Sequence, residues 1–182
     1  MRLLKRVFPI ILFIMGDQGI KLYITRYMME KEFDFPLVGY ILGFKPYLND
    51  KYSWVNSITN MGLNLVIHII LVIVLLILCL LLYDFIKIKY GMKSYVLWLF
   101  NFLFAGAICS LIDKVFWGGS LDFIWLKGFF IFDFKDIYVS IAEVMIILSL
   151  LTNKAIRKKP TMEILKDFSE YFKARFVLPT TN

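Results

Sequence analysis

The sequence has little of the chemistry that most metal sites and hydrolases use. It contains one histidine, His68, and two cysteines, Cys79 and Cys109, and all three fall within apolar runs. Neither a disulfide nor a usual zinc site is therefore expected. The sequence also lacks a Ser–His or Cys–His pair at a membrane interface and a glycine-rich phosphate loop, which argues against triad hydrolysis and nucleotide binding. We expect no metal and no cofactor, and interpret His68 as a hydrogen-bonded residue of helix packing.

Charged residues are also scarce, because 19% of the chain is charged whereas 60% is hydrophobic, and the mean hydropathy is +0.73. This composition excludes an ordinary soluble globular protein and predicts an integral membrane protein. The net charge of +7 would suit nucleic acid, but the basic residues stand beside apolar runs. Positive charge in such places is typical of membrane topology and of attraction to anionic lipid. We therefore expect membrane lipids as partners and no nucleic acid.

Long apolar runs are what the sequence does have. They cover residues 7–24, 63–83, 94–112 and 137–152. The first run resembles a secretory signal peptide, but no small-residue cleavage site follows it, and Asp17 and Lys21 interrupt it. We interpret it as a retained helix. The sequence thus predicts an all-α integral membrane protein with four transmembrane helices, the last of them somewhat short.

Clusters of lysine and arginine predict how these helices are oriented. The clusters lie in residues 2–6, 87–93 and 154–159, and four spans place all three on one side of the membrane. By the positive-inside rule this side is cytoplasmic. Both termini are therefore predicted to be cytoplasmic, and residues 26–60 and 114–135 are predicted to lie outside.

The two outer segments differ in composition. Residues 35–44 place aromatic and β-branched residues between turn formers, which predicts a short strand or hairpin. Residues 47–58 mix polar and aromatic residues, as is typical of a membrane–water interface. We predict that residues 26–60 form a small β-rich platform outside the membrane, and interpret residues 114–135 as an aromatic-rich loop broken by glycines.

Apolar residues recur at helical spacing after Pro160, opposite charged residues. They are Ile164, Leu165, Phe168, Phe172 and Phe176. This pattern predicts an amphipathic helix on the cytoplasmic membrane surface, favoured by anionic lipid. A soluble, partly disordered tail is the alternative.

Two aspartates stand at the outer ends of apolar runs, Asp113 after the third and Asp136 before the fourth. A carboxylate beside hydrocarbon is costly and points to function. Two acids held close together share one proton near neutral pH, and such a pair can activate a water and protonate a leaving amine. The alternative is that both merely mark solvated helix ends, Asp136 near a helix N-terminus. Glu143 follows on the helical face of Asp136, as a structural hydrogen-bond partner or a proton reservoir.

Asp17 and Lys21 add two charges to the first run. They are four residues apart and therefore share one face of a helix, where they can pair and reduce the cost of burial. The alternative to a functional role is a structural ion pair near the helix end.

Several of these residues belong to ordered motifs. The segments are residues 17–21 (DQGIK), Asn49 with Ser53 and Trp54, residues 106–114 (GAICSLIDK), residues 121–124 (LDFI) and residues 132–136 (FDFKD). In this order they resemble motifs of the lipoprotein signal peptidase (signal peptidase II) family: D-Q-x-x-K, an outer-loop Asn followed by small residues and an aromatic, G-x-x-x-N-x-x-D-R, V-D-F-I and F-N-x-A-D. The resemblance extends over most of the chain.

The chain departs from these patterns at Leu121, which replaces Val, and at five further positions. Ser110 replaces Asn, Lys114 replaces Arg, Asp133 replaces Asn, Lys135 replaces Ala, and Lys51 replaces Gly. Lys114 keeps the charge but loses the planar fork of arginine. Asp133 and Lys135 add two charges that we expect to perturb the aspartate pair. The chain is therefore interpreted as a divergent member.

The family consists of bacterial four-helix membrane aspartic proteases that cleave prolipoprotein signal peptides before a diacylglyceryl-modified cysteine. The resemblance implies that Asp113 and Asp136 are the catalytic dyad, at the outer face of the bacterial cytoplasmic membrane. The implied substrate-binding or dyad-supporting residues are Asp17, Lys21, Asn49, Ser110, Lys114, Asp122 and Asp133. It also implies prolipoprotein substrates, a monomer, a peptidase domain over residues 1–159 and an extension over residues 160–182.

Two alternatives remain at the level of sequence. The replacements around the dyad suit a homologue that binds lipidated proteins or peptides without cutting them. A proton-coupled carrier that uses the buried acids is weaker, since the sequence shows no internal repeat.

Overall fold

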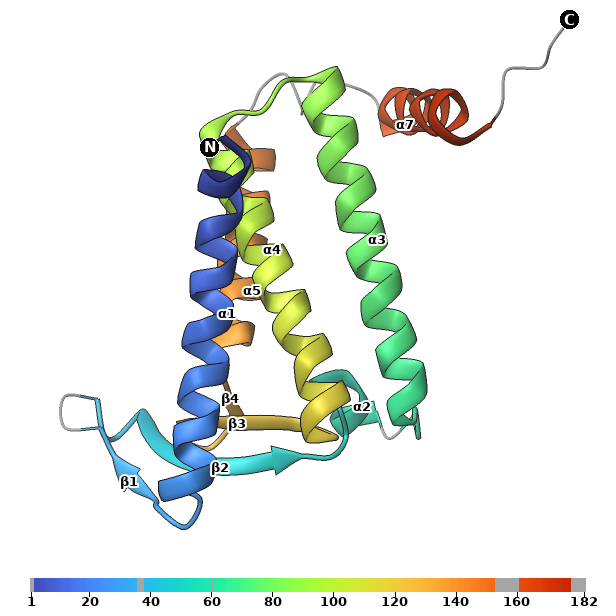
Figure 1. Ribbon diagram of the computed structural model, residues 1–182. Helices are drawn as coiled ribbons and strands as arrows, with labels where there is room; N and C mark the ends of the chain where they lie inside the picture. Colours follow the sequence, from blue (N-terminus) through green and yellow to red (C-terminus); the bar gives the residue numbers. More distant parts are fainter. Residues whose placement is uncertain (1, 36–37, 60, 153–160, 178–182) are drawn as a thin grey trace, which may run out of the picture.

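The computed structural model describes residues 2–35, 38–59, 61–152 and 161–177. Within them, long helices run alongside one another and a small sheet covers one end of the bundle (Figure 1). The long helices are α1 (Arg2–Tyr27), α3 (Leu65–Lys89), α4 (Ser94–Ile112) and α5 (Phe134–Thr152). Helix α4 packs against each of the other three. The predicted basic cluster at 154–159 and the predicted domain boundary after residue 159 lie outside the described residues.

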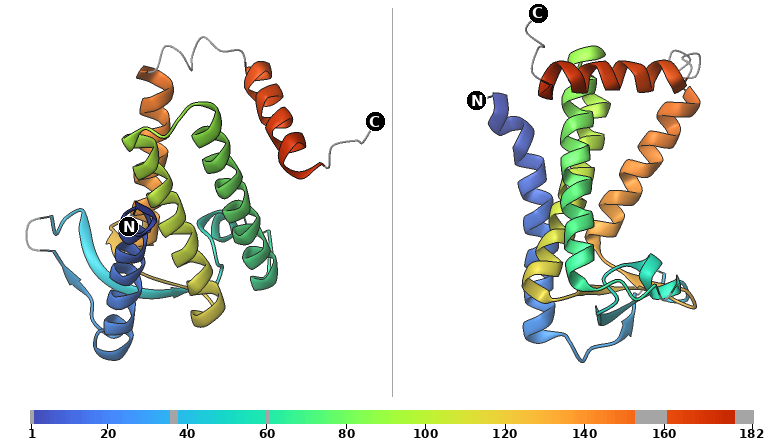
Figure 2. Two further views of the ribbon diagram at one scale, coloured as in Figure 1. Left: turned by 45° about the horizontal axis from the view of Figure 1, so that its top comes forward. Right: turned by 90° about the vertical axis from the view of Figure 1, so that its right-hand side faces the viewer.

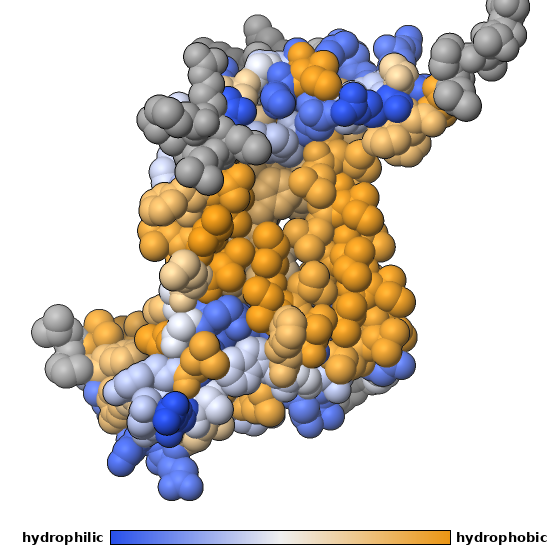
Figure 3. All heavy atoms as spheres, in the orientation of Figure 1, coloured by the Kyte–Doolittle hydropathy of each residue, from blue (hydrophilic) through white to orange (hydrophobic). Residues whose placement is uncertain are grey.

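Three helices among the described residues are long and apolar enough to cross a membrane: Arg6–Tyr27, Leu65–Lys89 and Ser94–Trp117. They correspond to the first three predicted runs. Helix α5 has 19 residues but carries Lys135, Asp136 and Glu143, so a fourth span remains a prediction. Around the middle of the bundle the exposed side chains form a hydrophobic band between two more polar ends (Figure 3). Such a band is unfavourable in water and suits the acyl chains of a bilayer.

The sheet contains four antiparallel strands in the order β1-β2-β3-β4. The strands are β1 (Phe33–Asp34), β2 (Leu42–Asn49), β3 (Ser120–Leu126) and β4 (Phe130–Phe132). A hairpin is present with Phe33 opposite Phe44, but its first strand precedes the predicted residues 35–44 and its second strand runs on to Asn49. A short helix, α2 (Trp54–Thr59), then leads towards α3.

The prediction of a loop over residues 114–135 was wrong. This segment contains a π-helical turn, η1 (Asp113–Trp117), followed by β3 and β4. Strand β3 forms because it pairs with β2, from Leu42 opposite Leu126 to Asn49 opposite Ser120. This partner is remote in sequence, so local composition did not reveal it. The fold is mostly helical rather than all-α, and both of the segments predicted to lie outside the membrane contribute to the sheet.

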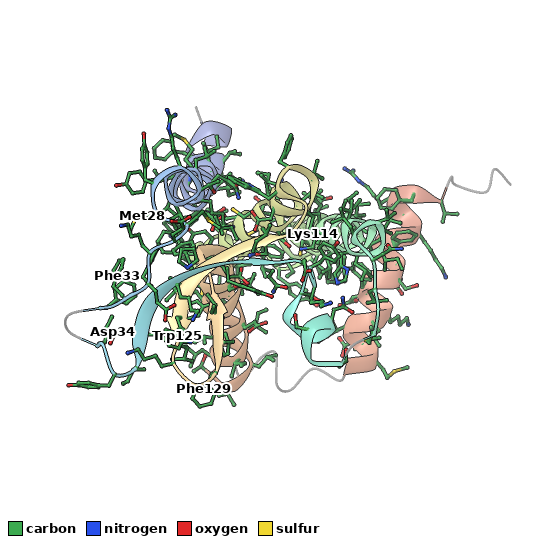
Figure 4. All side chains as sticks on the ribbon, turned by 90° about the horizontal axis from the view of Figure 1, so that it is seen from below. Met28, Phe33, Asp34, Lys114, Trp125 and Phe129 are labelled. Carbon is green, nitrogen blue, oxygen red and sulfur yellow. The ribbon has the colours of Figure 1, made fainter. Side chains whose placement is uncertain are left out.

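A small hydrophobic core joins the sheet to the helices. Ile24, in the last turns of α1, packs with Phe44 of β2 and with Leu121 and Phe123 of β3, and all four are buried. Figure 4 views this end from below, with Lys114 beside the end of α3 and with Phe33 and Asp34 well apart from it. The sheet is thus fixed beneath α1 and extends under the ends of the other helices.

Helix α7 (Thr161–Phe176) confirms the predicted helix after Pro160. It lies across the end of α3 that is remote from the sheet (Figure 2). Phe85 of α3 is buried there against the rings of Phe168 and Tyr171. The Tyr171 hydroxyl donates a hydrogen bond of 2.9 Å to Asp84. The start of α1 and helix α7 both lie at the end of the bundle opposite the sheet (Figure 1).

Candidate functional site

Charged side chains gather where the helix bundle meets the sheet. Lys21 lies at their centre, and its Nζ is 2.8 Å from Asp17, 2.7 Å from Asp113 and 2.6 Å from Asp133. All four side chains are fully buried. The predicted pairing of Asp17 with Lys21 is confirmed, but the pair is part of a larger cluster, because Lys21 also joins α1 to the end of α4 and the start of α5.

Lys135 is the second cation of this cluster. Its Nζ forms a very short contact with Asp133 and lies 3.2 Å from Asp113 and 3.6 Å from Asp122. It also donates a hydrogen bond to the Ser120 hydroxyl. The two charges that replace uncharged residues in the family pattern, Asp133 and Lys135, therefore neutralise one another. A buried ion pair of this kind is tolerated only when it is hydrogen-bonded on both sides, as it is here.

Asp122 approaches the cluster from strand β3. It accepts hydrogen bonds of 2.7 Å from Ser120 and 3.4 Å from the Asn49 side-chain amide. Ser120 and Asp122 are two residues apart in the strand, so their side chains point to the same face. Burial raises the pKa of Asp122 above its ordinary value, although Lys135 opposes this effect.

Asp133 caps the N-terminus of helix α5, and the effects of burial and of nearby charges on its pKa have a different balance from those on Asp122. Burial alone would raise its pKa, but the ammonium groups of Lys135 and Lys21 outweigh burial and lower it. The carboxylate of Asp133 accepts a hydrogen bond of 3.2 Å from the backbone N–H of Asp136. The carboxylate of Asp136 accepts one of 3.2 Å from the backbone N–H of Asp133 in return. This reciprocal pattern is a capping box, which orients both acids while it starts the helix.

Asp113 is placed by an irregular helix end. Helix α4 continues into the π-helical turn η1, and Gly118 ends this turn in a left-handed conformation, with φ of 64°. Such turns are frequent at functional sites because the wider turn redirects the side chains. Gln18 donates 2.9 Å hydrogen bonds to both Asp113 and Asp17, and its own oxygen accepts one of 3.1 Å from Trp117.

A cavity of about 680 Å³ opens beside the cluster. Ser120, Asp122, Lys135 and Asp136 line it at the sheet end, and side chains of α3 such as Leu71 line another wall. Ser140 and Glu143 also face it, which agrees with the predicted helical face below Asp136. Asp113 is fully buried and does not line the cavity. One end of the cavity therefore carries both carboxylates and ammonium groups, and the wall from α3 is aliphatic.

His68 and Lys114 lie on the same cavity. The His68 ring is hydrogen-bonded to the Ser53 hydroxyl at 3.1 Å and to the Asn64 carbonyl at 3.0 Å. These contacts agree with the interpretation of His68 as a hydrogen-bonded packing residue, but they also form a Ser–His pair that the sequence did not predict. Lys114 donates a hydrogen bond of 2.8 Å to the Ser110 hydroxyl. Two of the replaced family positions thus bind one another at the end of α4.

Comparison with known proteins identifies the scaffold. The sequence profile described as signal peptidase (SPase) II matches residues 9–152. The chain belongs to the signal peptidase II family. Its members are membrane-bound aspartic peptidases. A search of curated proteins gives no significant match.

Two solved structures resemble this signal peptidase II family protein. One is a bacterial membrane enzyme determined by the in meso method at 2.3 Å, with a TM-score of 0.69, 24% identity and coverage of 86% of this chain and 93% of the other. The second, described in the same words at 1.9 Å, has a TM-score of 0.66, 24% identity and coverage of 82% and 94%. At this identity the likeness supports the fold alone.

The fold brings the predicted site residues of this family member to one end of the bundle. Within the described residues, no hydrogen bond joins Asp113 to Asp136. Their carboxylates instead belong to two groups of three, each group within 4.8 Å, which share Asp133; the groups are Asp17, Asp113 and Asp133, and Asp122, Asp133 and Asp136. Lys21 contacts all three acids of the first group, and Lys135 contacts Asp122 and Asp133 of the second. Ammonium groups therefore occupy the places that a metal ion would need.

Sequence reasoning missed three contributors to the site. Gln18 is part of the matched motif at residues 17–21, so the motif itself could have indicated it. Lys135 was recognised only as a perturbing charge, although it contacts Asp113 directly. Ser120 carries no sequence signal beyond its position two residues before Asp122.

Proposed function

We propose that this protein is an aspartic endopeptidase that removes signal peptides from diacylglyceryl-modified prolipoproteins, cutting before the lipidated cysteine. The observation that carries this proposal is the cavity with acids at one end and aliphatic side chains of α3 on another wall. A lipidated peptide has matching parts, since its acyl chains need an apolar wall and its scissile bond needs an acid pair. Membership of the family supports the same activity.

Asp113 and Asp136 are proposed as the catalytic pair. One carboxylate takes a proton from the attacking water, and the other gives a proton to the leaving amine. Asp17, Lys21 and Asp133 hold Asp113, whereas Asn49 and Asp122 hold the sheet end of the cavity. Ser110 and Lys114 are proposed to contact the substrate from the end of α4.

The proposed location is a bacterial cytoplasmic membrane. In this arrangement α5 is the fourth span, the sheet and the acid cluster lie at the outer face, and the N-terminus and α7 are cytoplasmic. We also propose that the peptidase unit ends near residue 159, that residues 160–182 form an extension, and that the protein acts as a monomer.

The test is cleavage of a diacylglyceryl prolipoprotein by the purified protein. We expect a product that begins with the lipidated cysteine, and a loss of at least about 100-fold in rate for Asp113→Asn and for Asp136→Asn. Asp34→Asn is the matched control, because Asp34 is an exposed acid of the sheet that pairs with Lys127. Cleavage that survives both dyad substitutions would contradict the mechanism.

A second function is favoured by one observation, the complete burial of Asp113 beneath Lys21 and Lys135. A carboxylate held in this way suits a homologue that binds lipidated proteins or peptides without cutting them. Saturable binding of the lipidated substrate, measured by fluorescence anisotropy, without any product would favour this function over the first.

A further inference from the structure

The two proposed catalytic acids have unequal surroundings. Lys21 lies 2.7 Å and Lys135 lies 3.2 Å from the same oxygen of Asp113, Oδ2. Gln18 donates to the other oxygen at 2.9 Å. Every close partner of this carboxylate is a donor, and two of these donors are cations. Donors of this kind form their strongest hydrogen bonds with an ionised carboxylate.

Asp136 lacks comparable partners. Within the described part of the chain, no ammonium group lies within ion-pair distance of its carboxylate, which accepts one backbone N–H from Asp133 at 3.2 Å. Asp136 also lines the cavity, whereas Asp113 does not. It is therefore open to the medium from which a proton arrives.

Lys135 has a long side chain, but contacts with three partners hold its ammonium group in place. Its three N–H donors are directed at Asp133, at the Ser120 hydroxyl and at Asp113. Asp133 is in turn fixed as the first residue of the capping box of α5. The ammonium group therefore has no donor left for a substrate, and it acts on the two proposed catalytic acids by contact with Asp113 and by its positive charge near Asp136.

We propose that Lys135 is a positioning residue that holds Asp113 as the anionic member of the pair, whereas Asp136, which no ammonium group of the described residues contacts, carries the proton. This assignment rests on the proposed peptidase activity, because it gives the role of base to Asp113 and the role of acid to Asp136. The charge of Lys135 is balanced by Asp133. Removal of either residue alone therefore changes the net charge beside the dyad by one unit, in opposite directions.

Charged groups from several elements face Lys135 and enter this balance. They are Asp17 and Lys21 of α1, Asp113 and Lys114 at the end of α4, Asp122 of β3, Asp133, and Asp136 and Glu143 of its own helix. Each variant removes the charge of only the substituted residue and leaves the other charged groups in place. The direction of each shift therefore follows from the charge that is removed.

The experiment compares the pH profiles of kcat/KM for cleavage of the lipidated prolipoprotein. Lys135→Met removes a positive charge at similar volume, so both limbs should move to higher pH by about one unit or more. Asp133→Asn removes a negative charge while asparagine keeps the helix cap, so both limbs should move to lower pH. The double variant should return close to the original profile, and Lys135→Arg should retain it.

Lys45→Met is the matched control. It also removes one lysine charge, but Lys45 is an exposed side chain of β2 that pairs with Glu32 at 2.9 Å. Its pH profile should not move. Should Lys135→Met fail to fold, Asp133→Asn and the double variant still test the same balance.

The location of the proton can be measured without catalysis. Infrared titration of the purified protein detects the bands of protonated carboxyl groups, among them Asp122, whose pKa is raised by burial. One band should be lost in Asp136→Asn and kept in Asp113→Asn. Its midpoint should rise in Lys135→Met. A band that is lost in Asp113→Asn, or a midpoint that Lys135→Met leaves unmoved, would overturn the role of Lys135. Absence of cleavage by the unmodified protein would instead count against the proposed function alone.

Discussion

At the scale of single residues, the acid cluster is possible only because its charges are paired. Asp17, Asp113 and Asp133 each lose their hydration on burial, which costs several kcal/mol per ion. Lys21 contacts all three at 2.6–2.8 Å and so replaces the lost water. The Lys21 side chain therefore stabilises the fold as well as forming part of the candidate site.

Lys21→Met should destabilise the protein strongly. It leaves three buried carboxylates with fewer cations than they need, and the removal of one partner from a buried pair typically costs about 3–5 kcal/mol. We expect a clear fall in the free energy of unfolding, measured by denaturation in a mild detergent. Lys45→Met, in an exposed pair, should change it by less than about 1 kcal/mol. Equal stability of the two variants would contradict the central place of Lys21.

The contacts of this cluster could be predicted only where they are local. Asp17 and Lys21 were correctly paired, because four residues along a helix is a fixed spacing. The contact of Lys21 with Asp113, 92 residues further on, depends on how α1 packs against α4. Lys135 was expected to disturb the dyad. Its neutralisation by Asp133 depends on two side-chain directions at the start of α5, which spacing alone does not determine.

At the scale of elements, α4 and α5 approach closely at Gly106. A Cβ at this position would lie 2.7 Å from Val139 Cγ2 and 3.2 Å from the Lys135 carbonyl oxygen. Small residues of this kind allow membrane helices to pack tightly. The contact also fixes the backbone that carries Lys135 and Asp136.

Gly106→Ala should therefore lower the melting temperature, with a loss of about 1–3 kcal/mol from overpacking. Activity should fall with it, since a displaced α5 would move Asp136. Gly19→Ala is the matched control, because Gly19 is also helical but a Cβ added there would meet no other atom within 4 Å. It should be neutral or slightly stabilising. The same melting temperature for both variants would argue against the close approach.

Helix α7 keeps apolar side chains exposed, including Leu165 and Phe172, although it packs on α3 through Phe168 and Tyr171. It ends with Lys173 and Arg175 in its last turn. This combination suits the surface of a membrane that contains anionic lipid.

We expect the fluorescence of a Phe172→Trp variant in nanodiscs to be quenched by brominated lipid. Quenching should be stronger with phosphatidylglycerol than with phosphatidylcholine, because the basic last turn is attracted to the negative surface. A variant with Glu170→Trp, on an exposed polar position of the same helix, provides the comparison and should be quenched less. Equal quenching at both positions would favour a solvated tail.

The helices and strands that could be predicted are those whose sequence signal lies within the element itself. The three most apolar helices follow directly from their long apolar runs, and α7 follows from the helical spacing of its apolar residues. Strand β3 is short and its composition alone did not indicate a strand. It is stabilised by pairing with β2, which lies more than seventy residues earlier in the chain. The turn η1 continues α4 beyond the predicted end of the apolar run. A π-helical turn is defined by its backbone hydrogen bonds, so the composition of residues 113–117 did not indicate it.

At the scale of the whole molecule, the proposed topology can be tested from both sides of the membrane. Tyr40 is an exposed residue at the sheet end, with 87% of its surface accessible, and Glu170 is exposed on α7 at the opposite end. In intact bacterial cells a membrane-impermeant maleimide should label Tyr40→Cys at once and Glu170→Cys only after permeabilisation. Both variants should be made with Cys79 and Cys109 replaced. The reverse labelling pattern would invert the proposed orientation.

The wall that α3 contributes to the cavity has a consequence for kinetics. Leu71, Val72 and Leu75 line the cavity from a helix whose other side chains belong to the hydrophobic band (Figure 3). A lipidated substrate dissolved in the bilayer would meet the site by diffusion in two dimensions. Its effective concentration would then be its mole fraction among the lipids, and not its molarity in the sample. Dilution with substrate-free lipid should slow cleavage, whereas dilution with buffer at constant lipid composition should leave the turnover per enzyme unchanged.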